Sequence, residues 1–330
     1  MTTPHRFVLG DNNVWALRLD ASKGGGWLLV DAGWDADIEG VASWEVLVAQ
    51  ARAAGVTPED VRAVVVTHEH IDHAGLTARW ADLGARVVVG RAGMATLALG
   101  REANERVRDA RIEEYRRHGA PSEVLDALRG VHPTRALRWS PCPEDSLDAA
   151  EEQEPFRLAD GRTLRLIPAP GHTPGNLVAL IEETRELFSG DTVIPTTIPT
   201  AGLHFPGLIE GNEPARWPSL PSFLRSVAAI RALGVSRIYP GHGDVIEAPE
   251  VYLDRFETHH ARRGAKVQAA LIEAGEATAF ELVRAMFRRL PDERLGQAMT
   301  EVLGHLDLLE ERGAAVRLGG AGDLVRWRLL

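Results

Sequence analysis

The stretch Thr67-His68-Glu69-His70-Ile71-Asp72-His73 places four potential metal ligands within six residues, directly after the apolar run Ala63-Val64-Val65-Val66. That run is typical of a buried strand. The first two histidines of the stretch are two residues apart, so on an extended connection their side chains point the same way and can share one metal ion. The aspartate and the last histidine begin the next helix at a different angle and can supply a second ion. The stretch therefore predicts metal-assisted chemistry at the carboxyl end of a strand.

Glycine-containing turns elsewhere in the chain offer further ligands. They are Val30-Asp31-Ala32-Gly33, Gly171-His172-Thr173-Pro174-Gly175, Ser189-Gly190-Asp191 and Pro240-Gly241-His242-Gly243. Each of two ions would need one more histidine, and a carboxylate between the ions would hold both. His172, His242 and Asp191 meet these needs. Any one such histidine is more often an ordinary polar or surface residue, but the ordered set predicts a two-metal hydrolytic site.

Strand and helix patterns alternate on both sides of the histidine stretch. The expected strands are 14–19, 27–30, 63–66, 86–89, 156–158, 163–167, 177–181, 187–188 and 237–239, and the expected helices are 44–54, 74–83 and 222–233. The first two strands would form a hairpin around Gly24-Gly25-Gly26. Ligand-bearing turns follow the strands, which indicates an α/β domain with its site at the strand ends.

Three segments interrupt this alternation. Residues from about 94 to 129 are rich in Arg, Glu, Ala and Leu and show no strand pattern, so they predict an inserted pair of helices that Gly130 closes. Residues 133–154, with their prolines and an acidic run, predict an exposed linker. Residues 193–221 contain many prolines and form a long loop, which in a compact domain is usually functional or mobile.

The last part of the chain has a helical pattern of its own. Helices are expected at 250–274, 278–286 and 295–310, followed by strands at 315–318 and 324–327 around a Gly319-Gly320 turn. Helices followed by a short hairpin describe a small winged-helix-like module. With 330 residues in total, we predict a catalytic domain at 1–249, with its helical insert at about 94–154, and a winged-helix-like domain at 250–330.

Composition narrows the class of protein. A hydrophobic fraction of 45% and a charged fraction of 25% are ordinary for a globular protein, and a net charge of -10 argues against a general surface for nucleic acid. The single Cys142 cannot form an intrachain disulfide, which fits a reducing compartment. We find no secretion signal and no apolar run near the roughly 18 residues of a membrane span. We therefore expect a cytoplasmic protein without a membrane partner.

The ordered ligands resemble the metallo-β-lactamase superfamily, whose pattern is His-x-His-x-Asp-His, then His, then a bridging Asp, then His. The match extends from Asp31 to His242. The resemblance implies an αββα sandwich, in which two sheets pack face to face with helices outside. It implies one metal held by His68, His70 and His172, another held by Asp72, His73 and His242, a bridging Asp191, and an Asp31 that orients the ligands. Two Zn²⁺ ions are the default cofactors, and Fe or Mn²⁺ would also suit such ligands.

The mechanism expected from two such metals is hydrolysis. A water shared by two cations is acidified to a pKa of about 7. Asp72 can hold the resulting hydroxide and take its proton as the reaction proceeds. His204, on the long loop, and Tyr239, just before the last ligand turn, are candidates for substrate contact. The alternatives are a plain loop histidine and a packing tyrosine.

The superfamily supports many activities, so the metals do not determine the substrate. The segments Thr278-Ala279-Phe280-Glu281-Leu282-Val283 and His305-Leu306-Asp307-Leu308-Leu309 make the carboxyl-terminal module similar to the lactamase-beta-2-like branch, which includes endoribonucleases and polyketide thioesterases. Glyoxalase II-type thioesterases are another branch of the superfamily. The insert of about 60 residues departs from the family pattern and would lie over the site, either as a substrate lid or as a homodimer contact.

Our main prediction is a hydrolase of a small ester, thioester or lactone, because the full ligand set, the acidic net charge and the insert all fit a small-molecule substrate. One alternative is a metal-dependent endoribonuclease or phosphodiesterase, suggested by the carboxyl-terminal module. Another is a winged-helix nucleic-acid-binding protein with a dormant metal site. A redox activity with iron is the remaining alternative.

Overall fold

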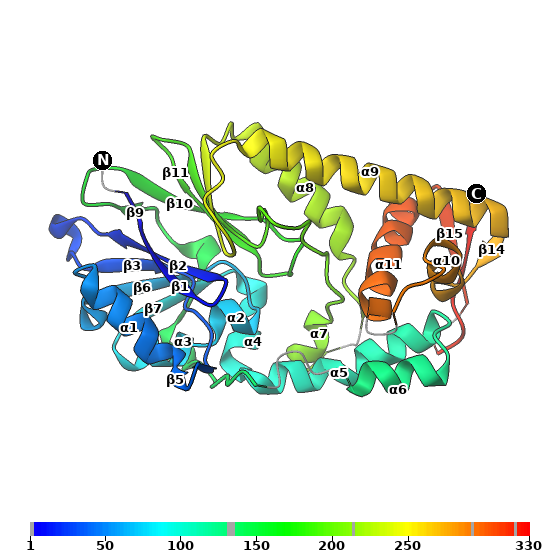
Figure 1. Cartoon of the computed structure of the whole chain (residues 1–330), viewed down its shortest axis with the longest axis horizontal. Helices are drawn as coiled ribbons and strands as arrows, with labels where there is room; N and C mark the ends of the chain where they lie inside the picture. The colour runs from blue at the N-terminus through cyan, green and yellow to red at the C-terminus, as the bar shows by residue number, and fades with distance from the viewer. Residues whose placement is uncertain (1–2, 131–135, 213–214, 292–293, 320–321) are drawn as a thin grey trace.

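Two β-sheets packed face to face form one half of the protein in the computed structural model (Figure 1). The model describes residues 3–130, 136–212, 215–291, 294–319 and 322–330. The strands of the first sheet, in spatial order, are β1 (His5–Leu9), β2 (Asn12–Arg18), β3 (Trp27–Val30), β6 (Val61–Val66), β7 (Arg86–Val89) and β8 (Leu147–Ala149). Those of the second sheet are β13 (Arg237–Pro240), β12 (Glu186–Gly190), β11 (Leu177–Ile181), β10 (Thr163–Pro168) and β9 (Phe156–Arg157). A short hairpin, β4 (Asp37–Ile38) with β5 (Val41–Ala42), lies beside α1 (Ser43–Ala53).

Parallel pairing gathers the ligand-bearing strand ends at one edge. In the first sheet, β3, β6, β7 and β8 are parallel neighbours, while β1, β2 and β3 are antiparallel. In the second sheet, only the pairing of β12 with β13 is parallel among the described strands. The carboxyl ends of parallel strands meet at the same edge of a sheet, so the turns after them lie close together.

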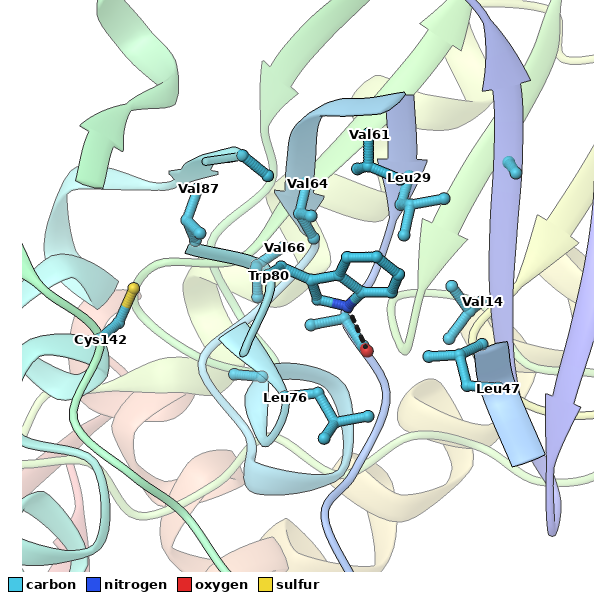
Figure 2. Packing of buried hydrophobic residues seen from close by; sticks show 14 of the residues in the cluster. Val14, Leu29, Leu47, Val61, Val64, Val66, Leu76, Trp80, Val87 and Cys142 are labelled. Atoms are coloured by element: carbon cyan, nitrogen blue, oxygen red, sulfur yellow. Dashed lines mark hydrogen bonds between the residues drawn. The ribbon is translucent and has the colours of Figure 1, made fainter. Parts of the chain in front are cut away.

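Helices cover the outer faces of the sheets, which confirms the predicted αββα sandwich. The first sheet packs against α1 (Ser43–Ala53), α2 (Ile71–Ala74) and α3 (Thr77–Asp82), and the second packs against α8 (Ser219–Ala232). Successive residues of β6 alternate between layers, because Val64 and Val66 belong to the core under the helices and Val65 belongs to the core between the sheets. Trp80 fills the core under the helices, and its indole N–H donates to the Ala32 carbonyl at 3.1 Å (Figure 2).

The insert differs from the predicted helical pair. It contains α4 (Met94–Leu99), α5 (Arg101–Arg117) and α6 (Ser122–Gly130). The first two helices are separated at Gly100, which has φ +57° and approaches the 139–141 backbone so closely that a Cβ would lie 2.9 Å from the Pro141 nitrogen. The predicted exposed linker is also partly wrong, because β8 within it pairs with β7 and Cys142 is buried. Residues 131–135 of that linker lie outside the described residues.

Other elements also differ from their predicted bounds. Strand β1 was not predicted, and the expected helix 74–83 is divided between α2 and α3. The long loop contains a short helix, α7 (Pro206–Ile209), and α8 begins three residues before its predicted start at 222. Short 3₁₀ helices connect several elements and are η1 (Ala21–Lys23), η2 (Pro58–Asp60), η3 (Arg91–Gly93), η4 (Glu144–Ser146) and η5 (Ala150–Glu152).

The carboxyl-terminal module consists of helices beside a small sheet. Its elements are α9 (Pro249–Ala274), β14 (Glu276–Ala277), α10 (Ala279–Met286), α11 (Leu295–Glu311), β15 (Ala315–Leu318) and β16 (Arg326–Leu329), with the sheet order β14-β16-β15. Thr278 and Glu281 form a capping box at the start of α10. Strand β14 was not predicted, the last strand begins at 326 rather than 324, and Gly320 of the expected turn lies outside the described residues. The winged-helix assignment remains a prediction.

The insert and the carboxyl-terminal module share one hydrophobic core. Val107 and Ile112 of α5 belong to the same buried cluster as Leu271 of α9 and Val302 of α11. In Figure 1, α9 runs from the sheets to the far end of the molecule, where α5 and α6 lie beside α10 and α11. Within the described parts of the chain, we find no helix long and apolar enough to cross a membrane.

Candidate metal centre

The seven predicted ligands come together at the edge where the ligand-bearing strands end. His68 and His70 follow β6, Asp72 and His73 lie in α2, and the turns after β10, β12 and β13 carry His172, Asp191 and His242. The glycine before Asp191 is required by close packing, since a Cβ on Gly190 would lie 2.2 Å from Thr67 Oγ1. Both sheets therefore contribute to a single cluster.

The cluster divides into two groups. His70 Nδ1 lies 3.1 Å from His68 Nε2 and 3.1 Å from His172 Nε2. In the second group, His73 Nε2 lies 3.2 Å from His242 Nε2. Asp72 Oδ2 lies 3.6 Å from the first of these nitrogens and 3.5 Å from the second. Each group thus presents three ligand atoms toward a common point.

The carboxylate of Asp191 lies between the two groups. Its Oδ1 atom is 3.4 Å from His73 Nε2, and its Oδ2 atom is 3.5 Å from His242 Nε2 and 3.7 Å from His172 Nε2. Asp191 Oδ1 is buried and has no hydrogen-bond partner among the described residues. A buried carboxylate oxygen without a hydrogen bond is costly unless a cation compensates it.

The donor set fits metal ions. Ligand nitrogens at about 2.0 to 2.1 Å from a tetrahedral Zn²⁺ lie about 3.3 Å from one another. The spacings of 3.1 to 3.2 Å between the imidazole nitrogens are close to that value. Lone pairs at such distances repel each other unless a proton or a cation lies between them. The residues present therefore suit two cations that accept nitrogen and carboxylate oxygen.

Hydrogen bonds behind the ligands fix their orientation. Asp31 is buried, and its Oδ2 atom lies 2.9 Å from His73 Nδ1, which directs the Nε2 atom of that ring toward the cluster. Its Oδ1 atom accepts hydrogen bonds from Thr67 N and Thr67 Oγ1, each at 2.8 Å. On the other side, His172 Nδ1 donates to the Thr200 carbonyl at 2.8 Å. Asp31 thus contacts the ring of a predicted ligand, and its role in orienting that ligand remains a prediction.

The electrostatics of the two groups differ. Burial, followed by the neighbouring His172, lowers the pKa of His70 to about 3, so that its ring is neutral. Burial would also lower the pKa of His73, but Asp191, Asp31 and Asp72 outweigh it and raise that pKa to about 9. For Asp191, burial would raise the pKa, but His73 and other histidines lower it to about 2. Near pH 7 the ring of His70 is therefore neutral and Asp191 is ionised, whereas the ring of His73 carries a proton that a bound cation would have to displace.

The two predicted substrate contacts have different outcomes. His204 lies at the cluster, since its Nε2 atom donates to the His172 carbonyl at 2.8 Å and its ring is 6.3 Å from that of His70. Tyr239 does not face the cluster, and the suggestion that it aims a hydroxyl there is wrong. Its hydroxyl donates to Glu186 at 2.8 Å, and its ring stacks on Phe188 between the sheets.

A small cavity adjoins the cluster on the side of the insert. Its volume is about 60 Å³, and its lining includes His70 and His204. The rest of the lining is mixed. It includes the apolar side chains of Val107, Leu203, Phe205 and Ile209 and the polar side chains of Glu69, Asn104 and Arg111. The insert therefore forms one wall of the approach to the site.

Sequence reasoning missed one residue that connects two ligand-bearing turns. Glu69 is buried, accepts from Thr173 Oγ1 at 2.6 Å, and accepts from the backbone N–H of Gly175 at 3.1 Å. It joins the turn that carries His68 and His70 to the turn that carries His172. The only signal available was its place between two histidines, and no spacing rule assigns a role to that position.

Comparison with known proteins agrees with this geometry. The family model described as metallo-beta-lactamase superfamily matches residues 8–242, and one described as metallo-beta-lactamase-like, C-terminal domain, matches residues 265–330. A probable metallo-hydrolase, YqjP of Bacillus subtilis, is 24% identical over 94% of this chain and 91% of its own length. An atrochrysone carboxyl ACP thioesterase of Aspergillus fumigatus is 25% identical over 87% of this chain and 72% of its own length.

A solved structure of a related protein is similar to this chain over its whole length. A metallo-beta-lactamase family protein from Thermus thermophilus is 28% identical, with a TM-score of 0.70 over 99% of this chain and 98% of that one. The family model covers most of the sandwich and every one of the converging ligands from His68 to His242. The chain therefore belongs to the metallo-beta-lactamase superfamily, a metal-dependent group, and is a hydrolase.

Proposed function

We propose that the chain is a dinuclear metal-dependent hydrolase of a small ester, thioester or lactone. The observation that carries the proposal is the position of the Asp191 carboxylate between two groups of three ligand atoms. In this proposal one ion is held by His68, His70 and His172, and the other by Asp72, His73 and His242. Two Zn²⁺ ions are our default, and Fe or Mn²⁺ would suit the same ligands.

A pair of such cations, when bound, acidifies a shared water and polarises the carbonyl group that it contacts. Asp72 is the residue that we assign to proton transfer. Its side chain is 34% exposed, against 11% for Asp191, so it is the more accessible carboxylate of the cluster. With one oxygen directed at His73 and His242, the other can hold the attacking water and accept its proton.

The cavity beside His70 supports a small, partly apolar substrate. Val107 of the insert and Phe205 of the loop would contact an acyl group there, and His204 would border it. The thioesterase named among the relatives makes a thioester the first choice within the ester class. In this proposal the insert is a wall of the substrate site. The alternative, in which the insert is a homodimer contact, is tested by measuring the oligomeric state.

The test is metal analysis of the purified protein together with a cleavage panel of an ester, an acyl thioester, a lactone and single-stranded RNA. We expect about two metal ions per chain and cleavage of at least one of the first three substrates. Asp191→Ala should lose metal and reduce cleavage by more than about a hundredfold, because both ions lose a ligand. Asp244→Ala, at an exposed carboxylate outside the cluster, is the matched control.

Two results would reject the proposal. If Asp191→Ala retains wild-type metal content and activity, the assigned centre is wrong. If the metal-loaded protein cleaves only RNA, with a strong dependence on salt, the endoribonuclease alternative replaces the small-ester proposal.

A further inference from the structure

A hydrogen bond between Glu69 and Thr173 lies directly behind one of the two groups of predicted ligands. The Thr173 hydroxyl donates to Glu69 Oε2 at 2.6 Å. Glu69 lies between His68 and His70 in the sequence. Thr173 follows His172. The three residues that we assign to one ion, here called the first site, are therefore all sequence neighbours of a residue in this hydrogen bond.

The hydrogen bond is sheltered from water. Glu69 is 8% exposed, and Thr173 is fully buried. The other carboxyl oxygen of Glu69, Oε1, accepts from the backbone N–H of Gly175 at 3.1 Å. A buried carboxyl group that loses its donors destabilises the fold. The free energy of the folded chain thus favours an arrangement in which the turn 171–175 stays against Glu69.

Two glycines allow other segments to close around the carboxyl group. A Cβ on Gly175 would lie 2.7 Å from Glu69 Oε2, and one on Gly93 would lie 3.2 Å from the same atom. Gly93 is the last residue of η3, which follows β7. The carboxyl group is therefore enclosed by the connection after β6, by the ligand turn after β10 and by η3. Such close packing leaves the Glu69 side chain little freedom to move.

The second site, formed by Asp72, His73 and His242, has a different carboxylate behind it. Asp31 Oδ2 lies 2.9 Å from His73 Nδ1. Asp31 also accepts from the Thr67 hydroxyl, which contacts His68 Nδ1 at 3.1 Å, so Asp31 borders both sites. Among the hydrogen bonds between described residues, none joins Glu69 or Thr173 to a ligand of the second site. Glu69 thus borders the first site alone.

We propose that Glu69 is a positioning residue for the first site only. Through Thr173 and Gly175 it holds the turn of His172 where His172 Nε2 lies 3.1 Å from His70 Nδ1, a separation at which the two rings can share an ion. Loss of this support would weaken the first site and leave the second site unchanged. The inference rests on the proposed dinuclear centre, and it adds that the two sites are supported separately.

The test is a titration of the metal-free full chain with Zn²⁺ in competition with a chromogenic chelator, which measures affinity without activity. Thr173→Val removes the hydroxyl and keeps the shape of the buried side chain. We expect it to weaken the first site about tenfold, the lower end of the range for residues that support a metal ligand. Thr173→Ser retains the hydroxyl and should retain the wild-type affinity.

Two background variants assign the loss to a site. His242→Ala removes a ligand of the second site and leaves the first, and His172→Ala does the reverse. Thr173→Val should weaken Zn²⁺ binding in the His242→Ala background and leave it unchanged in the His172→Ala background. Glu69→Met, which removes both acceptor oxygens, should show the same selectivity with a larger loss. Urea unfolding of the metal-free variants checks that they fold, and Thr173→Val carries the test if Glu69→Met does not.

A carboxylate outside the metal centre serves as a further control. Glu186 is also largely buried and accepts from a threonine hydroxyl, that of Thr184, at 2.6 Å. It lies at the start of β12, whereas Asp191 follows the end of that strand. Glu186→Gln should therefore leave the Zn²⁺ affinity of both sites unchanged.

Three results would overturn the proposal. Equal losses of affinity in the two backgrounds would show that Glu69 supports the centre as a whole. Wild-type affinity of Thr173→Val and Glu69→Met in the His242→Ala background would show that Glu69 supports neither site. If the wild-type chain itself binds fewer than two ions, the dinuclear centre is rejected and this inference falls with it, whereas the first two results leave the proposed function standing.

Discussion

Asp31 holds an unusual backbone conformation next to the metal centre. Its φ is +67°, a left-handed value that few residues other than glycine, asparagine and aspartate adopt. From that position the carboxylate accepts two hydrogen bonds from Thr67 and contacts His73 Nδ1. The strain is thus associated with an arrangement that sets the proton position on the ring of a predicted metal ligand.

We predict that Asp31→Asn weakens metal binding about ten- to a hundredfold while the protein still folds. Asparagine tolerates the same φ and can still accept from Thr67. Its amide NH₂ would then face His73 Nδ1, so that the ring would place its proton on Nε2, the atom that faces the cluster. Competition with a chelator measures the affinity, and Asp82→Asn on the surface of α3 is the control. An unchanged metal affinity in Asp31→Asn would show that Asp31 does not support metal binding.

The candidate ligands were easier to predict from the sequence than the residues around them. The candidate ligand positions could be predicted because four of them are crowded into residues 68–73 directly after a recognisable strand, and the other three lie in glycine-containing turns after strands. The substrate contact suggested for Tyr239 was wrong, and the alternative of a packing tyrosine is confirmed. Side chains alternate along β13, and Tyr239 lies on the face that packs against Phe188 and Trp15 between the sheets. Glu69 was missed because its partners are more than 100 residues away in the chain.

At the scale of elements, Arg216 connects the site loop to two distant helices. Its guanidinium bonds Glu114 of α5 at 2.7 Å and both oxygens of Asp307 of α11 at 2.5 and 2.6 Å. All three side chains are nearly inaccessible to solvent. The next residue, Trp217, donates its backbone N–H to the His204 carbonyl. One buried arginine thus links the insert, the loop and the carboxyl-terminal module, beside the hydrophobic core that they share.

We predict that Arg216→Met lowers the free energy of unfolding by about 3 to 5 kcal/mol, because it leaves two carboxylates buried without their cation. Urea unfolding at pH 7 measures the change. The control is Arg225→Met, which removes a partly exposed pair with Glu311 and should change stability by less than about 1 kcal/mol. Equal losses of unfolding free energy in the two variants would show that the buried ion pairs of Arg216 contribute no more to stability than an exposed pair does.

The same network should contribute to acid sensitivity. Burial alone would raise the pKa of Glu114, but the hydrogen bond with His118 and the charge of Arg216 lower it to about 2. The folded value lies below the unfolded value of about 4.3, so the stabilisation is present above that pH and is lost as the pH falls toward 2. We predict that the wild type loses stability more steeply between these two values than Glu114→Gln does. Urea unfolding across that pH range measures the stability of both proteins. Equal losses of unfolding free energy in the wild type and in Glu114→Gln would contradict the prediction.

Elements with long, clear patterns were the ones that the sequence identified well. Helix α9 begins one residue before its predicted start and ends where expected, and β7 and β11 have their predicted bounds. Strand β8 was not found, because three residues are too few for an alternation, and its position depends on pairing with β7, which is about 60 residues away in the chain. The insert was predicted as a pair of helices, but α4 and α5 are separate because the chain breaks at Gly100. The conformation of Gly100 follows from its close contacts with residues 139–141.

At the scale of the whole molecule, α9 belongs to two cores. Leu253 and Phe256 near its start pack with α8 against the second sheet, whereas Val267 and Leu271 near its end belong to the core shared by the carboxyl-terminal module and the insert. The insert is connected to the first sheet at both ends by α4 and β8. Each half of the molecule therefore contributes residues to the core of the other.

We predict that a chain cut after residue 249, at the domain boundary proposed from the sequence, does not fold on its own. It would lose α9 and expose Val107 and Ile112 of the insert, whose apolar partners lie beyond the cut. We expect aggregation or strong binding of a hydrophobic dye, and loss of bound metal, because the loop beside His172 also loses its contacts. The full chain should unfold in one cooperative transition. A monomeric 1–249 fragment with a normal metal content would show instead that the two parts are independent domains.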